Sequence, residues 1–197
     1  MPTTHHWCLR AALVVAMLCA MPSAAPADGL FGERKAMCMQ CHGANGVSPT
    51  PEVPSLGGMP EFYALVQLVE FREGNRTNPI MTDMIKGMSD DDLRAAAAWI
   101  TSLPPPPAPE KPGDPARMER GRALAAQYRC GICHGPKYLG GEQMPPLRHQ
   151  REDYLLKSLR AFKAEERIGD RAAMIEVLLP LKDVDLVDLA HYLAHVR

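Results

Sequence analysis

Hydrophobic residues recur at helical spacing in several stretches of the chain. The clearest stretches run from Phe62 to Phe71 and from Tyr154 to Phe162, where apolar residues stand three and four positions apart. Shorter helices are predicted at residues 32–37, 118–128, 90–99 and 183–192. Alternation with a period of two residues, the pattern of a half-buried strand, is essentially missing. The chain is therefore predicted to be all-α.

The predicted helices occur in the same order twice, on either side of a proline-rich segment. Residues 104–115 cannot form a helix or a central strand, because proline lacks an N–H donor and has a fixed φ. Such a run is an extended, semi-rigid spacer. It divides the mature chain into predicted domains at 28–103 and 116–197, each so small that a bound cofactor would supply much of its core.

One pentapeptide pattern occurs once in each predicted domain, as Cys38-Met39-Gln40-Cys41-His42 and as Cys130-Gly131-Ile132-Cys133-His134. Cys-x-x-Cys-His is the attachment pattern of c-type haem. The four thiols would bond to porphyrin vinyl groups, and each histidine would ligate iron from one side. The alternatives are a redox dithiol, which calls for a βαβ pattern, and a zinc site, which calls for ligands in one shared place. Two covalently bound haem c groups are therefore predicted.

The N-terminus has the organisation of a secretory signal peptide. A positive charge at Arg10 precedes an apolar stretch at residues 11–20, and Ala25-Pro26-Ala27 offers a cleavage site. The prediction is a cleavable signal over residues 1–27 and export to the periplasm, with an uncleaved anchor or lipidation at Cys19 as alternatives. No later stretch is long and apolar enough to span a bilayer.

The charge balance removes one class of partner. The chain has 22 Lys and Arg against 23 Asp and Glu, and its formal net charge is −1 at pH 7. Both signs are interspersed, so there is no basic patch of the kind that binds phosphate backbones. No nucleic-acid partner is expected.

The occupant of the second axial position of each iron decides between electron transfer and catalysis. Eight residues before Ser89 and Lys182, which directly precede the last predicted helix of each domain, the chain has Met81 and Met174, and these stand 39 and 40 residues after the motif histidines. The repeat therefore predicts these two as distal ligands. Met84 is the rival in the first domain, and a bis-histidine site is the other alternative. The remaining pocket methionines are expected to pack: Met59, Met88 and Met144.

Two prolines are candidates to orient the proximal ligands. Pro54 and Pro145 follow the motif histidines by 12 and 11 residues, and each could present a carbonyl oxygen to the other imidazole N–H. The alternative is that both are ordinary turn residues.

Together these features resemble the dihaem class I cytochromes c of the cytochrome c4 type. The resemblance rests on both haem motifs, the Pro-x-Leu that follows each, Phe-Arg-Glu-Gly-Asn-Arg at 71–76, Met81, and Ser-Asp-Asp-Asp-Leu at 89–93. It covers nearly all of the mature chain, and the second domain departs from it at 162–171 and 176–181. It implies two tandem class I cytochrome c domains, each wrapped around a covalent haem with His/Met ligation.

The resemblance also implies a periplasmic carrier rather than an enzyme. Its redox partners would be a terminal oxidase, a cytochrome reductase or a flavoprotein dehydrogenase, and peripheral association with a membrane stays open. The alternative is the electron-accepting cytochrome subunit of a dehydrogenase complex, such as flavocytochrome c sulfide dehydrogenase. A dihaem peroxidase, which needs one open iron, is a third hypothesis, and no acid–base constellation in the sequence supports it.

Overall fold

The computed structural model describes residues 29–167 and 172–197, so the predicted signal peptide lies outside the described residues. Within these ranges every regular element is a helix, apart from one isolated antiparallel bridge between Arg76 and Arg167. The first half contains α1 (Gly29–His42), α2 (Glu61–Arg72), α3 (Pro79–Ile85) and α4 (Asp90–Ser102). The second half contains α5 (Pro115–Gln127), α6 (Cys130–His134), α7 (Glu152–Lys163), α8 (Ala172–Leu178) and α9 (Asp183–His195). The all-α prediction is confirmed.

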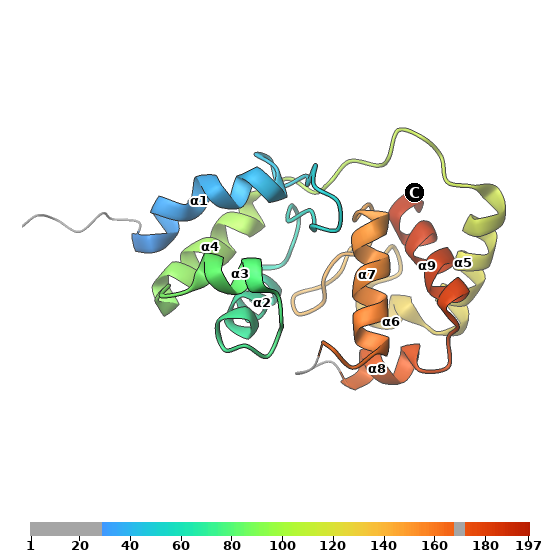
Figure 1. Ribbon diagram of the computed structural model, residues 1–197. Helices are drawn as coiled ribbons and strands as arrows, with labels where there is room; N and C mark the ends of the chain where they lie inside the picture. The colour runs from blue at the N-terminus through green and yellow to red at the C-terminus, as the bar shows by residue number, and fades with distance from the viewer. Residues whose placement is uncertain (1–28, 168–171) are drawn as a thin grey trace, which may run out of the picture.

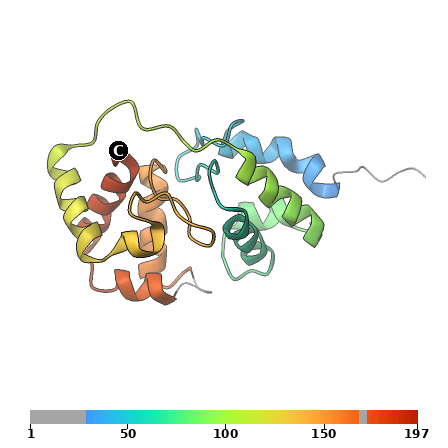
Figure 2. The same cartoon turned by 180° about the vertical axis from the view of Figure 1, so that it is seen from behind.

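The two halves lie side by side and are joined by a long connection over residues 103–114 that has no helix or strand (Figures 1 and 2). In the first half α4 packs against α1 and α2, and in the second half α9 packs against α5 and α7. Each half has a separate hydrophobic core, centred on Leu93 and Ala97 in one and on Leu186 and Ala190 in the other. Each half thus forms a unit around its own last helix.

The helix that carries the haem motif differs between the halves. In the first half α1 continues through the motif to His42, beyond the predicted end at residue 37, because no proline or glycine interrupts it before Gly43. In the second half the helix breaks at Arg129, which is in the left-handed region at φ 54°, and α6 starts at Cys130.

Helix α4 begins with reciprocal hydrogen bonds. The Ser89 hydroxyl accepts the Asp92 N–H, and the Asp92 carboxylate accepts the Ser89 N–H at 2.9 Å. This capping box satisfies two of the backbone donors that a helix start leaves unpaired. Ser89 is thus the N-cap of α4.

Several polar contacts join the halves. The Gln150 amide contacts the Ser55 backbone, and Lys157 forms an ion pair with Glu52 at 3.0 Å. Among the described helices, none is long and apolar enough to cross a membrane.

Candidate haem sites

Both motif histidines lie at the last residue of a helix and are buried. The next residue is Gly43 in the first half and Gly135 in the second, with φ of 83° and 79°. Glycine adopts this left-handed conformation without steric cost, and it commonly ends helices. The helix end therefore leaves each histidine at the start of a loop that can fold back over it.

The two imidazoles are held in the same way. His42 Nδ1–H donates to the Pro54 carbonyl oxygen at 2.8 Å, and His134 Nδ1–H donates to the Pro145 carbonyl oxygen at 2.9 Å. Since a carbonyl oxygen only accepts, Nδ1 carries the hydrogen in both rings and Nε2 is the nitrogen whose lone pair can ligate a metal. The predicted role of both prolines is confirmed.

The pKa shifts of His42, Cys38 and Cys130 suit covalent attachment of haem better than a redox-active dithiol. Burial, together with the charge of Arg76, lowers the pKa of His42 and favours the neutral imidazole that ligation requires; the Pro54 carbonyl partly opposes this shift. Burial raises the pKa of the Cys38 and Cys130 thiols. Redox-active dithiols depend on a lowered thiol pKa, and the shifts of Cys38 and Cys130 have the opposite direction. All four motif cysteines are free of disulfide bonds.

A single apolar cavity of 1140 Å³ extends across the two halves. It is larger than about 300–1,000 Å³, the usual range of small-molecule pockets, and its size suits two large flat ligands better than one. The residues that carry the predicted axial roles all line it: His42, Met81, His134 and Met174. The cavity therefore has the size, the apolar walls and the nitrogen and sulfur donors that two haems need.

The two candidate distal methionines occupy equivalent places. Helices α3 and α8 are each seven residues long, and Met81 and Met174 are the third residues of these helices. Both pack against the core of their own half. The Met81 N–H donates to the side-chain oxygen of Asn78, which caps α3, at 3.1 Å. The equivalence that the repeat predicted thus extends to the local fold.

The cavity lining includes all four of the other methionines considered above, Met59, Met84, Met88 and Met144. Met59 and Met88 are in addition buried in the first core, which confirms their packing role. Because Met84 lies three residues after Met81 on the same short helix, both side chains reach the same face. Cavity lining alone therefore does not separate these two candidate ligands.

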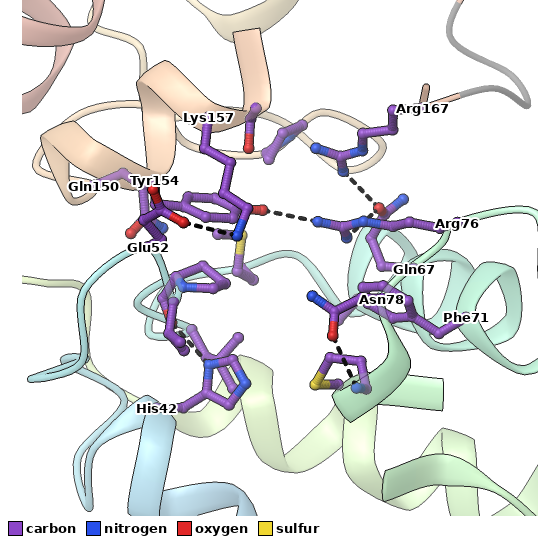
Figure 3. A pocket seen from close by; sticks show the side chains of 18 of the residues that line it. His42, Glu52, Gln67, Phe71, Arg76, Asn78, Gln150, Tyr154, Lys157 and Arg167 are labelled. Carbon is purple, nitrogen blue, oxygen red and sulfur yellow. Dashed lines mark hydrogen bonds and ion pairs between the residues drawn. The ribbon is translucent and has the colours of Figure 1, made fainter. Parts of the chain in front are cut away.

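One wall of the cavity holds two guanidinium groups that the sequence reasoning did not identify (Figure 3). Arg76 and Arg167 both donate to the Gln67 side-chain oxygen, at 2.8 and 2.6 Å. Arg76 also donates to the Tyr154 hydroxyl and Arg167 to the Tyr63 hydroxyl, each at 3.0 Å. Within the described part of the chain, neither guanidinium has a carboxylate at ion-pair distance, although Arg167 is only 7% exposed.

This wall favours a negative charge. Burial opposes ionisation of Tyr154, but the charges of Arg76 and Arg167 outweigh it and lower the pKa of the phenol to about 7. Buried charges without a counter-charge are costly even when they are hydrogen-bonded, so a site of this kind calls for an anion. The carboxylate groups of haem are anions of that kind, and the wall fits them.

The remaining histidines have other partners. His191 Nε2 accepts the Asp114 N–H, and its Nδ1–H donates to Glu152, each at 2.8 Å. His195 and Glu152 lie close enough to His191 to form a possible metal cluster, but Arg117 already pairs with Glu152 at 2.8 Å. Of the described histidines, those that line the cavity are the two motif histidines. Bis-histidine ligation has no support in this geometry.

Comparison with known proteins identifies the family. The profile of the family Cytochrome c matches residues 28–104 and again residues 118–197. The chain belongs to the cytochrome c family. It is similar to the thiosulfate dehydrogenase electron acceptor of Thiomonas intermedia, with 35% identity over 94% of this chain and 91% of that protein.

Two solved structures are similar along most of the chain. The crystal structure of reduced recombinant cytochrome c4 from Pseudomonas stutzeri has a TM-score of 0.75 and 30% identity, and the match covers 88% of this chain and 100% of that one. Thiosulfate dehydrogenase (TsdBA) from Marichromatium purpuratum has a TM-score of 0.69 and 31% identity, over 80% of this chain and 36% of that one.

These matches confirm the predicted fold and cofactor. The chain is a dihaem, cytochrome c4-like electron-transfer cytochrome with two tandem cytochrome c domains and two covalently bound haem c groups. Its partners are redox proteins.

Proposed function

We propose that this cytochrome carries electrons through two closed haem sites, with His42 and Met81 on one iron and His134 and Met174 on the other. The observation that carries the proposal is the single cavity that both histidines and both methionines line. Cys38, Cys41, Cys130 and Cys133 are the thioether anchors. Haem supplies the one-electron change between ferric and ferrous iron.

The protein's own groups set the environment of that change. The carbonyls of Pro54 and Pro145 orient the imidazoles and keep Nε2 available. Arg76 and Arg167 would bind the haem carboxylates and offset their charge at the contact between the halves. With a thioether on the distal side, no axial position is left for a substrate, so the proposed site transfers electrons and performs no further chemistry.

The absorption spectrum tests this ligand set. Ferric haem with histidine and methionine ligands has a weak charge-transfer band in the far red, and Met81→Ala and Met174→Ala should each remove half of it. Met84→Ala is the matched control in the same helix and should leave the band intact. Loss of the band in Met84→Ala would reassign the first distal ligand.

We further propose that the electron donor is a dehydrogenase and that the acceptor is an oxidase or a reductase. The similarity to a thiosulfate dehydrogenase electron acceptor over almost the whole of both chains supports this direction. Stopped-flow mixing of the oxidised cytochrome with a thiosulfate dehydrogenase and thiosulfate should reduce both haems. Reduction only by a flavoprotein sulfide dehydrogenase would instead favour the flavocytochrome alternative.

The proposed setting is the periplasm, after removal of residues 1–27. Domain 1 would span 28–103, the spacer 104–115, and domain 2 116–197, boundaries that the two family matches support. Intact mass and N-terminal sequencing of the secreted protein should give a chain that starts at Asp28 and carries two haems. A retained N-terminus or a lipid on Cys19 would contradict this processing.

A further inference from the structure

The loop over residues 48–55 holds the first haem motif at two points. The Ser48 hydroxyl donates to the Cys41 carbonyl at 2.9 Å, and the Pro54 carbonyl accepts the His42 Nδ1–H. Within the loop, the Ser48 N–H donates to the Ser55 hydroxyl at 3.1 Å. Any displacement of this loop therefore changes the position of the acceptor that orients His42.

The second half holds this loop from the other side. The Gln150 side-chain oxygen accepts the Ser55 N–H, and the Gln150 amide donates to the Ser55 carbonyl, both at 2.8 Å. Gln150 is 4% exposed and Ser55 is 2% exposed. The neighbouring Arg151 donates to the Ser48 carbonyl at 3.0 Å. Gln150 and Arg151 of the second half thus bind Ser55 and Ser48, the two ends of the loop in the first half.

The contact with Ser55 reaches His42 through one peptide group. The Ser55 N–H and the Pro54 carbonyl belong to the same planar amide. Gln150 accepts at its N–H end, while His42 donates at its oxygen end. Hydrogen bonds in such a chain polarise one another, so the bond that the Ser55 N–H donates to Gln150 makes the Pro54 oxygen a stronger acceptor. A stronger acceptor makes the imidazole a more basic ligand.

The second motif cannot have this connection. His134 donates to Pro145, and the next residue is Pro146, which has no N–H. The amide that orients His134 therefore ends at a ring nitrogen. Both motif histidines donate to a proline carbonyl, but only the first of these peptide groups, Pro54–Ser55, has an N–H that can donate to the other half.

We propose that Gln150 is a positioning residue for the first haem, through which the docking of the second half sets the basicity of His42 and hence the potential of that haem. The inference rests on the proposed ligation by His42. A more basic ligand stabilises ferric iron, so Gln150 lowers the potential of the first haem and leaves the second unaffected.

Gln150→Leu tests the inference in the full dihaem protein. Neighbouring hydrogen bonds strengthen one another by about 10–30% per bond. Loss of this effect implies a change of about two- to tenfold in the equilibrium constant for one-electron reduction of the first haem. This corresponds to a rise of roughly 20–60 mV in the midpoint potential of the first haem. Lys157→Gln is the matched control, since it removes another contact between the halves, to Glu52 in the same loop, without touching the Pro54–Ser55 amide.

Paramagnetic NMR of the His42 Nδ1–H supplies a second readout, on the proton that the Pro54 carbonyl oxygen accepts. We expect this resonance to shift in Gln150→Leu and to stay in place in Lys157→Gln, while the His134 resonance is unchanged in both. Gln150→Met, which removes the same acceptor with an unbranched side chain of similar length, should change the potential in the same direction as Gln150→Leu, which keeps the test valid if Gln150→Leu fails to fold.

The outcomes separate this inference from the ligand assignment. If the wild-type His42 proton shows no iron-induced shift, the proposed ligation itself is wrong. If it is shifted but both potentials move together in Gln150→Leu, or neither moves in the folded variants, only the role of Gln150 is overturned.

Discussion

In each half, a buried aspartate on the last helix accepts hydrogen bonds from the first helix, and this contact is called the fastening of that half. The group that donates to the aspartate differs between the two halves. In the first half Asp92 accepts the Phe31 N–H of α1 at 3.0 Å. In the second half Asp188 accepts from the Arg120 guanidinium of α5 at 2.5 and 3.0 Å. A backbone N–H is fixed by its helix, whereas a long charged side chain must be ordered and is screened by salt. The two halves have the same architecture, but the fastening is a hydrogen bond from the backbone in the first half and an ion pair in the second.

The short methionine helices show the same kind of difference. The end of α3 is held from α1, where Arg34 donates to the Met84 and Lys86 carbonyls at 2.7 and 2.8 Å. The end of α8 is held from α7, where Lys163 donates to the Leu179 carbonyl at 2.6 Å. In the first half, the helix with the candidate distal ligand is thus tied directly to the helix that ends at His42. The two halves have Met81 and Met174 in equivalent positions but hold the two methionine helices with different groups.

The largest effect should follow from loss of a distal ligand. Met81→Ala and Met174→Ala should each open one iron, so that carbon monoxide binds one haem of the reduced protein instead of none. Flash photolysis measures the two sites separately. Because α3 is tied to α1, the opened first site should keep its proximal geometry, and carbon monoxide binding by the unsubstituted protein would contradict closed ligation.

The crossing of α5 and α9 should break when Gly121 is enlarged. A Cβ at this position would lie 2.4 Å from the Asp188 carbonyl oxygen, so Gly121→Ala forces the helices apart. We expect a loss of about 3 kcal/mol of stability. Hydrogen exchange should rise in α5 and α9 and stay unchanged in α1 and α4. Gly141→Ala, where an added Cβ meets nothing within 4 Å, is the control.

Asp92→Ala should destabilise the first half by about 2 kcal/mol, because it removes the capping box and leaves the Phe31 N–H unpaired. Asp188→Ala should cost less, since the exposed Arg120 can return to water. Hydrogen exchange of α1 and α5 compares the two variants. If Asp188→Ala lost more stability than Asp92→Ala, the fastening of the second half would be the stronger one, contrary to this prediction.

Acid should weaken both fastenings. Hydrogen bonds from the Phe31 N–H and from Ser89 lower the pKa of Asp92, and a hydrogen bond from Arg120 lowers the pKa of Asp188. Both groups therefore stabilise the fold above the unfolded pKa of about 3.9, and this stability is lost as the pH falls through the lower folded values. Thermal unfolding against pH measures the loss, and Asp92→Asn should flatten it for the first half.

The smallest effect should be that of salt. High ionic strength should raise hydrogen exchange slightly in α5, where the fastening is ionic, and leave α1 unchanged. Equal changes in both helices would show that the two fastenings do not differ in character.

The sequence alone determined the main helices, the duplication and the histidine acceptors, since each depends on spacing within one half. The apolar period locates α2, α4, α7 and α9 because it is repeated over enough turns. Helices α3 and α8 were not predicted, because seven residues are too few for a period to emerge. Each haem motif is followed directly by the loop that carries the proline 11 or 12 residues after its histidine, so counting was sufficient.

Only the tertiary structure decided how the halves meet. Arg76 and Arg167 share one amide oxygen, and Gln150 reaches Ser55 from 95 residues away. Each of these side chains looks like an ordinary surface residue in the sequence, because a contact across two separately folded cores leaves no periodic signal. The sequence thus specifies two haem-binding halves, whereas docking determines which charges face the cavity and which proximal histidine the other half can reach.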